Sequence, residues 1–139
     1  MSAGAGVNFD AVGFTAAATT DADYIAGDVI QFPRAVANIG SHYNESTGVF
    51  TCPVTGMYHM QLSVLSANST SAQVSIVHQA SAVGTAFGDT ADMNQGATSA
   101  VFVCNAGEEV WTEAAAATGV SSDSTGLYNV FSGYLVYPV

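Results

Sequence analysis

Oxygen-bearing side chains gather in one segment of the sequence, where they could bind a hard cation. Asp89, Asp92 and Asn94 lie within a stretch of six residues, and carboxylate and amide oxygens are ligands that calcium takes in proteins. Calcium binds six or more oxygens, so other ligands would have to come from elsewhere. Composition slightly favours the alternative, an ordinary Asp/Asn turn. A second acidic segment with a weaker claim contains Asp21, Asp23 and Asp28.

Planar polar side chains in predicted loops could bind sugars. Amides, carboxylates and imidazoles donate and accept hydrogen bonds in the directions that sugar hydroxyls need. The candidates of this type are His42, Asn44, Glu45, Asn68 and Gln79. Their spacing is not specific for sugar binding, so this prediction rests on residue type alone.

Side chains that would carry catalysis are sparse. His42, His59 and His78 could in principle bind a transition metal, but their spacing lacks the paired ligand motif of metal enzymes. The sequence contains no Gly-x-Ser-x-Gly nucleophile elbow. We therefore expect a protein that binds rather than catalyses, and a metal enzyme is the remote alternative.

The two cysteines, Cys52 and Cys104, have no second cysteine or histidine at the spacing of a zinc site. They form either one disulfide bridge or two buried thiols.

The charge of the chain excludes one large class of partners. Only 9% of the residues are charged, Arg34 is the one Lys or Arg, and the net charge is -10. A duplex-binding protein needs several basic side chains to neutralise phosphates, so we expect no binding to nucleic acid. No apolar run approaches the roughly 18 residues of a membrane span, so we expect no membrane insertion either.

Apolar residues fall in short runs rich in Val, Phe, Tyr and Thr, which predicts an all-β domain. Residues 1–6 are expected to be a tail and residues 7–139 the domain. The predicted strands are Val7–Ala16, Val29–Phe32, Ala35–Asn38, Gly48–Cys52, Gly56–Leu65, Gln73–Gln79, Val83–Phe87, Thr98–Cys104, Glu109–Ala116 and Tyr128–Tyr137. The predicted surface loops are Thr19–Gly27, Ser66–Ala72, Gly88–Gly96 and Gly119–Gly126.

The last predicted strand is apolar on both faces. Tyr134 and Val136 belong to one phase of the alternation, and Phe131, Leu135 and Tyr137 to the other. In a sandwich one face of a strand meets the core, so the second face needs other cover. At this chain length a partner subunit is the expected cover.

An ordered series of motifs resembles the globular C1q domain, and the match extends from Phe14 to Pro138. Each motif is weak by itself, but their order and spacing together are specific. The motifs are Phe14-Thr15-Ala16, Val29-Ile30-Gln31-Phe32, Asn38-Ile39-Gly40, Tyr43-Asn44, Thr47-Gly48-Val49-Phe50-Thr51-Cys52-Pro53, Gly56-Met57-Tyr58, Gly107-Glu108-Glu109-Val110-Trp111 and Phe131-Ser132-Gly133-Tyr134-Leu135-Val136-Tyr137-Pro138.

The resemblance implies a ten-stranded, two-sheet jelly-roll sandwich of the tumour necrosis factor type that packs as a homotrimer. Aromatic and aliphatic side chains of the motifs would then lie in the core or between subunits, and these are Tyr58, Phe131, Tyr134, Leu135 and Tyr137. Family topology brings the strand ends that carry Cys52 and Cys104 to the same rim, where a bridge could form. Two buried thiols are favoured, because the usual family partner of Cys52 lies elsewhere.

The resemblance also implies a function. The chain lacks the Gly-X-Y repeat of a collagen-like stalk, so it resembles stalkless C1q-domain proteins of invertebrates, many of which are lectins. It is therefore expected to be a secreted pattern-recognition protein of innate immunity that binds microbial glycans, with calcium as a candidate cofactor near the three-fold apex. No signal segment is present in MSAGAG. The alternative is a cytokine-like or structural trimer that binds a protein receptor or a matrix partner.

Overall fold

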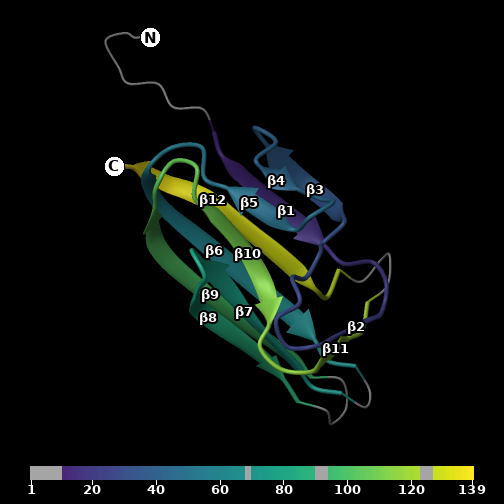
Figure 1. Cartoon of the computed structure of the whole chain (residues 1–139). Helices are drawn as coiled ribbons and strands as arrows, with labels where there is room; N and C mark the ends of the chain where they lie inside the picture. Colours follow the sequence, from purple (N-terminus) through teal and green to yellow (C-terminus); the bar gives the residue numbers. More distant parts are fainter. Residues whose placement is uncertain (1–10, 68–69, 90–93, 123–126) are drawn as a thin grey trace, which may run out of the picture.

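The computed structural model describes residues 11–67, 70–89, 94–122 and 127–139. Two five-stranded antiparallel sheets face each other as a sandwich (Figure 1). Sheet 1 consists, in spatial order, of β3 (Arg34–Ile39), β1 (Gly13–Ala17), β12 (Val130–Pro138), β6 (Gly56–Leu65) and β9 (Gln95–Cys104). Sheet 2 consists of β4 (Tyr43–Asn44), β5 (Val49–Thr51), β10 (Glu109–Ala114), β7 (Ala72–His78) and β8 (Ser81–Gly88). Within these ranges the chain has no helix that could cross a membrane.

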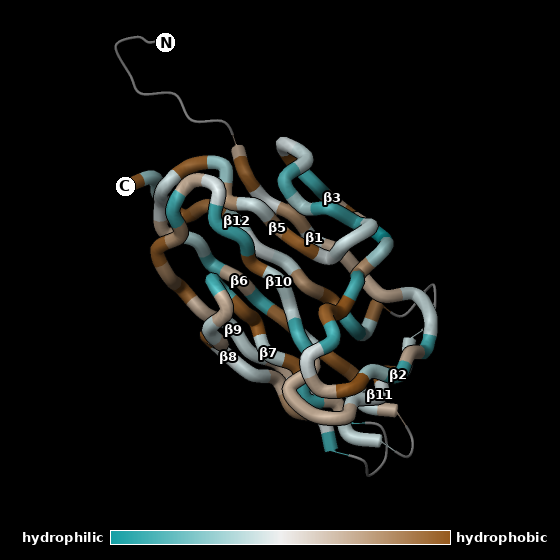
Figure 2. The backbone as a smooth tube through the Cα atoms, viewed as in Figure 1, coloured by the Kyte–Doolittle hydropathy of each residue, from teal (hydrophilic) through white to brown (hydrophobic). Residues whose placement is uncertain are grey.

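The strands form where the sequence alternates. Tyr58, Met60 and Leu62 of β6 are fully buried, whereas the residues between them point to the other face of the sheet. Hydrophobic segments therefore recur along both sheets (Figure 2). Where the alternation is strong, as in β6, the predicted bounds are the observed ones.

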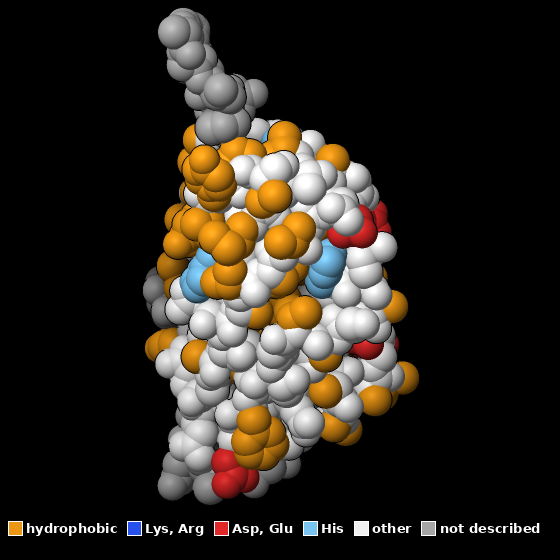
Figure 3. Space-filling view, turned by 90° about the vertical axis from the view of Figure 1, so that its left-hand side faces the viewer, with side chains coloured by type: hydrophobic (Ala, Val, Ile, Leu, Met, Phe, Trp, Pro, Cys, Tyr) orange, Lys and Arg blue, Asp and Glu red, His pale blue; other side chains and the backbone are white. Residues whose placement is uncertain are grey.

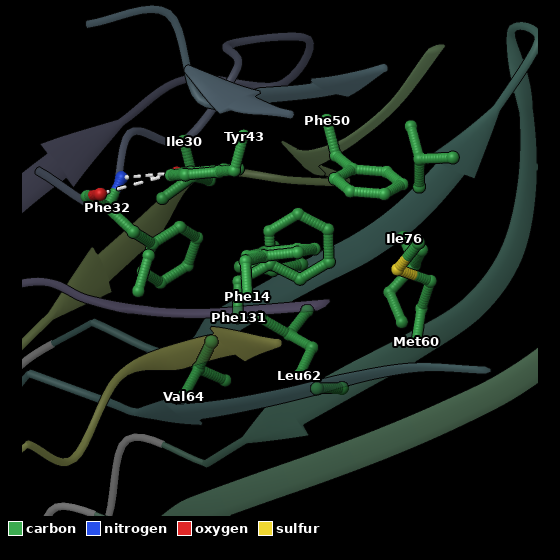
Figure 4. Packing of buried hydrophobic residues seen from close by; sticks show 14 of the residues in the cluster. Phe14, Ile30, Phe32, Tyr43, Phe50, Met60, Leu62, Val64, Ile76 and Phe131 are labelled. Carbon is green, nitrogen blue, oxygen red and sulfur yellow. Dashed lines mark hydrogen bonds between the residues drawn. The ribbon is translucent and has the colours of Figure 1, made fainter. Parts of the chain in front are cut away.

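Aromatic rings fill the space between the two sheets (Figure 4). Phe14 of β1 stacks on Tyr43 with ring centroids 4.7 Å apart, and it meets Phe131 of β12 edge-on at 5.0 Å. Phe50 of β5 also lies 5.0 Å from Phe14. Offset and edge-to-face pairs of this kind stabilise a core beyond the area that they bury. The motif aromatics of sheet 1 and sheet 2 thus hold the layers together.

The sandwich is closed where β8 of sheet 2 meets β9 of sheet 1. A methyl group on Gly96 would overlap the backbone of Phe87, and one on Gly84 would lie 2.8 Å from Oγ1 of Thr98. Only glycine allows two backbones to approach so closely. The loop between these strands is shorter than the predicted Gly88–Gly96, since β8 includes Gly88 and β9 begins at Gln95.

One predicted strand is wrong. Val29–Phe32 makes an isolated bridge from Val29 to Glu113 rather than a strand. Its apolar residues Ile30 and Phe32 are buried, so the pattern reflects insertion into the core. Pro33 follows at once and has no N–H to continue a ladder.

One short strand lies inside a segment that the sequence predicts as a loop, Thr19–Gly27, and another overlaps the start of the predicted loop Gly119–Gly126. β2 (Ala22–Tyr24) and β11 (Thr118–Val120) pair with each other as a small antiparallel sheet at one end of the sandwich (Figure 1). Their three-residue length leaves too little alternation for a sequence pattern to indicate a strand. The N-terminal boundary predicted at residue 6 lies outside the described residues.

Cys52 and Cys104 form a disulfide, so the expectation of two buried thiols is wrong. The bridge ties the segment after β5 to the end of β9, with the two Cα atoms 6.4 Å apart. Both half-cystines are fully buried.

Candidate functional site

The outer face of sheet 1 differs from the rest of the described chain in its charge. The five strands of this sheet contain no aspartate or glutamate, although the chain has eleven acidic residues. Arg34, at the start of the edge strand β3, is their one Lys or Arg. Figure 3 shows hydrophobic side chains gathered in the upper left of the view, with no acidic side chain visible among them.

Large apolar side chains stand on this face without cover from the described chain. Tyr134 and Tyr137 of β12 are 51% and 66% exposed, and Val101 and Val103 of β9 are 56% and 53% exposed. A contiguous apolar patch on a soluble domain marks an interaction surface. The outer face of sheet 1 is therefore the first candidate site.

Strand register places its residues in a row across the sheet. Ile39 is opposite Gly13, Gly13 is opposite Tyr134, Tyr134 is opposite His59, and His59 is opposite Val101. The rings of His59 and Tyr134 lie 5.4 Å apart between centroids. A shallow hollow of about 270 Å³ lies beside this row, with side chains of Thr15, Gln61 and Ser132 among its lining.

The side chains predicted for the core or the trimer interface divide between the core and the outer face of sheet 1. Tyr58 and Phe131 are fully buried in the core, and Leu135 packs against it. Tyr134 lies on the outer face. Tyr137 also lies there, opposite Met57, because a register shift after Leu135 turns the strand by one residue. Its predicted phase, shared with Phe131, is therefore wrong.

Three sugar-site candidates lie at β4, since His42 precedes the strand, Asn44 is its last residue and Glu45 follows it. The side-chain oxygen of Asn44 accepts a hydrogen bond from the amide of Ser46 at 2.9 Å, and Glu45 accepts one from the amide of Ala35 at 3.1 Å. Both side chains are exposed. His42 packs over Gly40, where a methyl group would lie 2.5 Å from its Nε2 atom.

Gln79 is exposed in the turn between β7 and β8. Gln79 and Ala80 both have positive φ, 51° and 64°, which is the backbone of a tight two-residue hairpin of type I′. The Gln79 side chain is therefore attached to a backbone whose conformation is fixed by the turn. Asn68, the remaining sugar-site candidate, lies outside the described residues.

The predicted calcium loop is described only at its two ends. The carbonyl oxygens of Asp89 and Asn94 accept hydrogen bonds from the hydroxyl and the amide of Ser66, respectively. Asp92 lies outside the described residues. The backbone contacts hold Asp89 and Asn94 on either side of Ser66, which brings the ends of the loop together.

In the second acidic segment the carboxylates support turns. Asp28 accepts a hydrogen bond from the amide of Ile25 at 2.9 Å, and Asp21 accepts one from the amide of Ser122 at 2.8 Å. Hydrogen bonds of this kind, from backbone amides to aspartate side chains, commonly stabilise loops.

A cluster that sequence reasoning did not foresee lies beside the disulfide. His78 Nε2 and Glu108 Oε1 are 2.9 Å apart, and the ring of His78 stacks on Phe102. The amide of Asn105 donates to Glu108, and this bond, followed by that from His78, lowers the pKa of the Glu108 carboxyl. The Cys104 sulfur also lies within 4.8 Å. This sulfur belongs to the disulfide and offers no thiolate to a metal. The cluster is therefore a structural contact between the end of β7 and the turn that follows β9.

Buried tyrosine hydroxyls are likewise structural. Burial raises the pKa of Tyr43 to about 12. Its hydroxyl donates to the carbonyl of Phe32 and accepts from the amide of Phe32. Tyr58 donates to the carbonyl of Val54 at 2.6 Å. These two motif tyrosines are therefore scaffold residues rather than ligand contacts.

Comparison with known families decides what this scaffold is. The family model of the C1q domain matches residues 13–136, which is nearly all of the sandwich. The chain belongs to the C1q-domain family.

Curated relatives of this C1q domain carry the same domain within longer chains. The chain is 29% identical to mouse complement C1q tumor necrosis factor-related protein 2 over 111 residues, which cover 78% of the chain and 37% of that protein. It is 31% identical to mouse complement C1q tumor necrosis factor-related protein 7, with coverages of 78% and 38%. The C1q domain thus spans less than two fifths of the length of these relatives.

Solved structures confirm the jelly roll of the C1q and tumour necrosis factor type. The globular domain of zebrafish complement 1qA matches with a TM-score of 0.72 at 18% identity, over 92% of this chain and 99% of that one. Eiger TNF from S. frugiperda matches with a TM-score of 0.68 at 9% identity, with coverages of 94% and 96%. Murine APRIL matches with a TM-score of 0.66 at 14% identity, with coverages of 91% and 99%.

Proposed function

We propose that this C1q domain is a homotrimeric recognition module that binds microbial glycans without catalysis, and that sheet 1 forms the contact between its copies. The observation that carries the proposal is the absence of acidic residues from all five strands of sheet 1. Each copy has a net charge of -10, so copies repel one another unless they meet through a face that lacks carboxylates. Membership of the C1q-domain family, whose members are typically trimers, supports the trimer.

Burial of the apolar outer face would provide the driving force for assembly. Each square ångström of apolar surface removed from water contributes about 25 cal/mol. Tyr134, Tyr137 and Val101 would then be interface residues, together with Ile39 across the sheet. A negative charge introduced at Tyr134 should break the trimer, because Arg34, the one Lys or Arg, lies two strands away.

A matched pair of variants tests this contact. Tyr134→Glu should sediment as a folded monomer at neutral pH. Ile25→Glu places the same charge at a 71% exposed apolar residue outside sheet 1, and it should remain a trimer. A Tyr134→Glu trimer as stable as that of Ile25→Glu would contradict the proposed contact.

Glycans would be bound by exposed polar turns at the edges of the assembly. His42, Asn44, Glu45 and Gln79 combine amide, carboxylate and imidazole groups, and Asn68 belongs to the same proposal. A trimer presents three copies of each weak site, and simultaneous engagement raises the overall affinity by about 10²–10⁴. Calcium at Asp89, Asp92 and Asn94 is part of the proposal as a candidate cofactor. Release into the extracellular space, where such ligands occur, is proposed as well.

A glycan array with the folded trimer tests the recognition function, in calcium and in chelator. Binding to a defined class of microbial glycans is expected, with a loss of at least tenfold in the monomeric Tyr134→Glu variant. Asp89→Asn combined with Asp92→Asn should remove any calcium dependence, whereas Asp28→Asn should not. Silence of the folded trimer on the whole array would contradict the lectin proposal.

A second candidate function is recognition of a protein. The curated relatives are named for tumor necrosis factor, and the structural neighbours include APRIL and Eiger TNF. A trimer of this type would cross-link a receptor or a matrix protein. Binding of the trimer to a purified protein partner that persists in excess competing sugar would favour this candidate over the lectin.

A further inference from the structure

We propose that His59 makes assembly of the domain pH-dependent, so that the trimer forms at neutral pH and dissociates at mildly acidic pH. This inference rests on the proposed trimer, because it requires the outer face of sheet 1 to be buried between copies. It goes beyond the trimer by naming the residue that controls assembly and the condition that reverses it.

The position of His59 in the sheet is unambiguous. Its neighbours Tyr58 and Met60 point into the core and are fully buried, so the imidazole of His59 points to the outer face. It is opposite Tyr134 on one side and Val101 on the other. The imidazole also lines the hollow beside this row.

No carboxylate of sheet 1 can neutralise a protonated His59. The groups on the outer face that ionise or carry charge are Tyr134 and Tyr137 of β12 and Arg34 of β3, which is separated from β6 by two strands. Strands β1 and β9 contribute none, and Tyr58 of the same strand points inward. A second copy that contacts this sheet with its own sheet 1 brings the same acid-free strands. The imidazolium would therefore be buried without an ion-pair partner.

The energetics follow from this environment. In the monomer His59 is partly exposed to water, and histidine is the side chain that gains a charge as the pH falls into the mildly acidic range. Burial of the charged form without a partner is strongly unfavourable, so the trimer selects neutral imidazole. Protons then bind the monomer in preference to the trimer, and acid dissociates the assembly.

The size of the effect is set by three equivalent histidines in each trimer. If each takes up one proton on dissociation, the trimer dissociation constant rises by at most about a thousandfold per pH unit. The switch would release the domain from its trimer in an acidic compartment and lower its avidity for any ligand there.

Sedimentation equilibrium at pH 7.5 and pH 5.5 tests the inference, with circular dichroism to confirm that both states are folded. The wild type should change from trimer toward monomer, and His59→Gln should remain a trimer at both pH values. His42→Gln and His78→Gln remove the other two histidines, which lie in a turn and at the rim, and should keep the pH dependence of the wild type. His59→Lys should be a folded monomer even at pH 7.5.

The outcomes separate the inference from the proposed function. A wild-type trimer whose dissociation constant is the same at both pH values would overturn the inference alone. The inference also fails if His59→Gln dissociates in acid as the wild type does. A wild-type monomer at pH 7.5 would instead overturn the trimer, and the switch with it.

Discussion

Tyr43 belongs to a motif that could be taken for a ligand site, but its hydroxyl is bonded to the protein backbone. Its hydroxyl satisfies the amide and the carbonyl of Phe32, and its ring stacks on Phe14. Phe32 lies just before Pro33 in a segment that has no regular ladder beyond one bridge. The hydroxyl thus replaces backbone partners that a strand would have supplied.

Tyr43→Phe should lower the free energy of unfolding by about 1–3 kcal/mol, because it leaves two buried backbone groups of Phe32 without a partner. Urea denaturation, followed by the fluorescence of the single tryptophan, measures the change. Tyr128→Phe removes the same hydroxyl from an exposed ring outside the strands of sheet 1 and serves as the control. Equal stabilities of the two variants would show that the Tyr43 hydroxyl contributes nothing.

Glu108 should make a pH-dependent contribution to stability. The hydrogen bond from Asn105, followed by that from His78, lowers its pKa in the folded state below the ordinary value of 4.5. The contribution is therefore fully present above pH 4.5 and disappears as the pH falls through the lower folded value. Glu108→Gln should be less stable than the wild type at pH 6, and the difference should vanish toward pH 3.

Chemical denaturation at a series of pH values measures that difference. Glu109→Gln removes one negative charge from the adjacent position and controls for the overall charge. A stability difference between wild type and Glu108→Gln that stays constant from pH 6 to pH 3 would contradict the assignment.

At the scale of the strands, the clearest constraint is the contact between β8 and β9. A methyl group on Gly96 would overlap the backbone of Phe87, which cannot move without opening the edge of the sandwich. A methyl group on Gly133 of β12 would overlap Met60 instead, at the end of a flexible side chain. A methyl group would be equally close to its neighbour at both sites, but a side chain can move away and the backbone of Phe87 cannot.

Gly96→Ala should consequently destabilise the domain by about 2 kcal/mol or more, and by more than Gly133→Ala does. Thermal unfolding of both variants at equal concentration gives the comparison. If Gly133→Ala is the more damaging substitution, β8 and β9 are held less tightly than described.

The sequence predicts strands well where alternation is long and poorly where other forces set the structure. β6 alternates over ten residues and its bounds are predicted correctly. Ile30 and Phe32 also look like a strand, but their burial comes from a segment that dips into the core. The bridge joins Cys52 and Cys104, which are 52 residues apart in the sequence. A local sequence pattern cannot indicate that two such distant segments meet.

The candidate site is predictable only in part, for a similar reason. The apolar second face of β12 indicates a contact surface from sequence alone. The outer face as a whole depends on strand order, because β9 and β3 become neighbours of that surface only when the sheet forms. Alternation places His59 on the polar side of its strand, and its importance emerges when Tyr134 and Val101 are found on either side.

At the scale of the whole molecule, the distribution of charge over the surface matters more for self-association than the net charge does. A chain with eleven acidic residues and one basic residue should avoid its own copies. All eleven nevertheless lie outside the strands of sheet 1. Sheet 2 and the connecting segments carry the acidic side chains that the structure describes, and sheet 1 has the low charge that is typical of the centre of a contact surface.

The mass of the wild-type protein in solution tests this account most directly. Sedimentation velocity at pH 7.5 and micromolar concentration should give a single species of three times 14.1 kDa, the mass of one chain. A species of 14.1 kDa under the same conditions, from protein shown to be folded, would contradict the account.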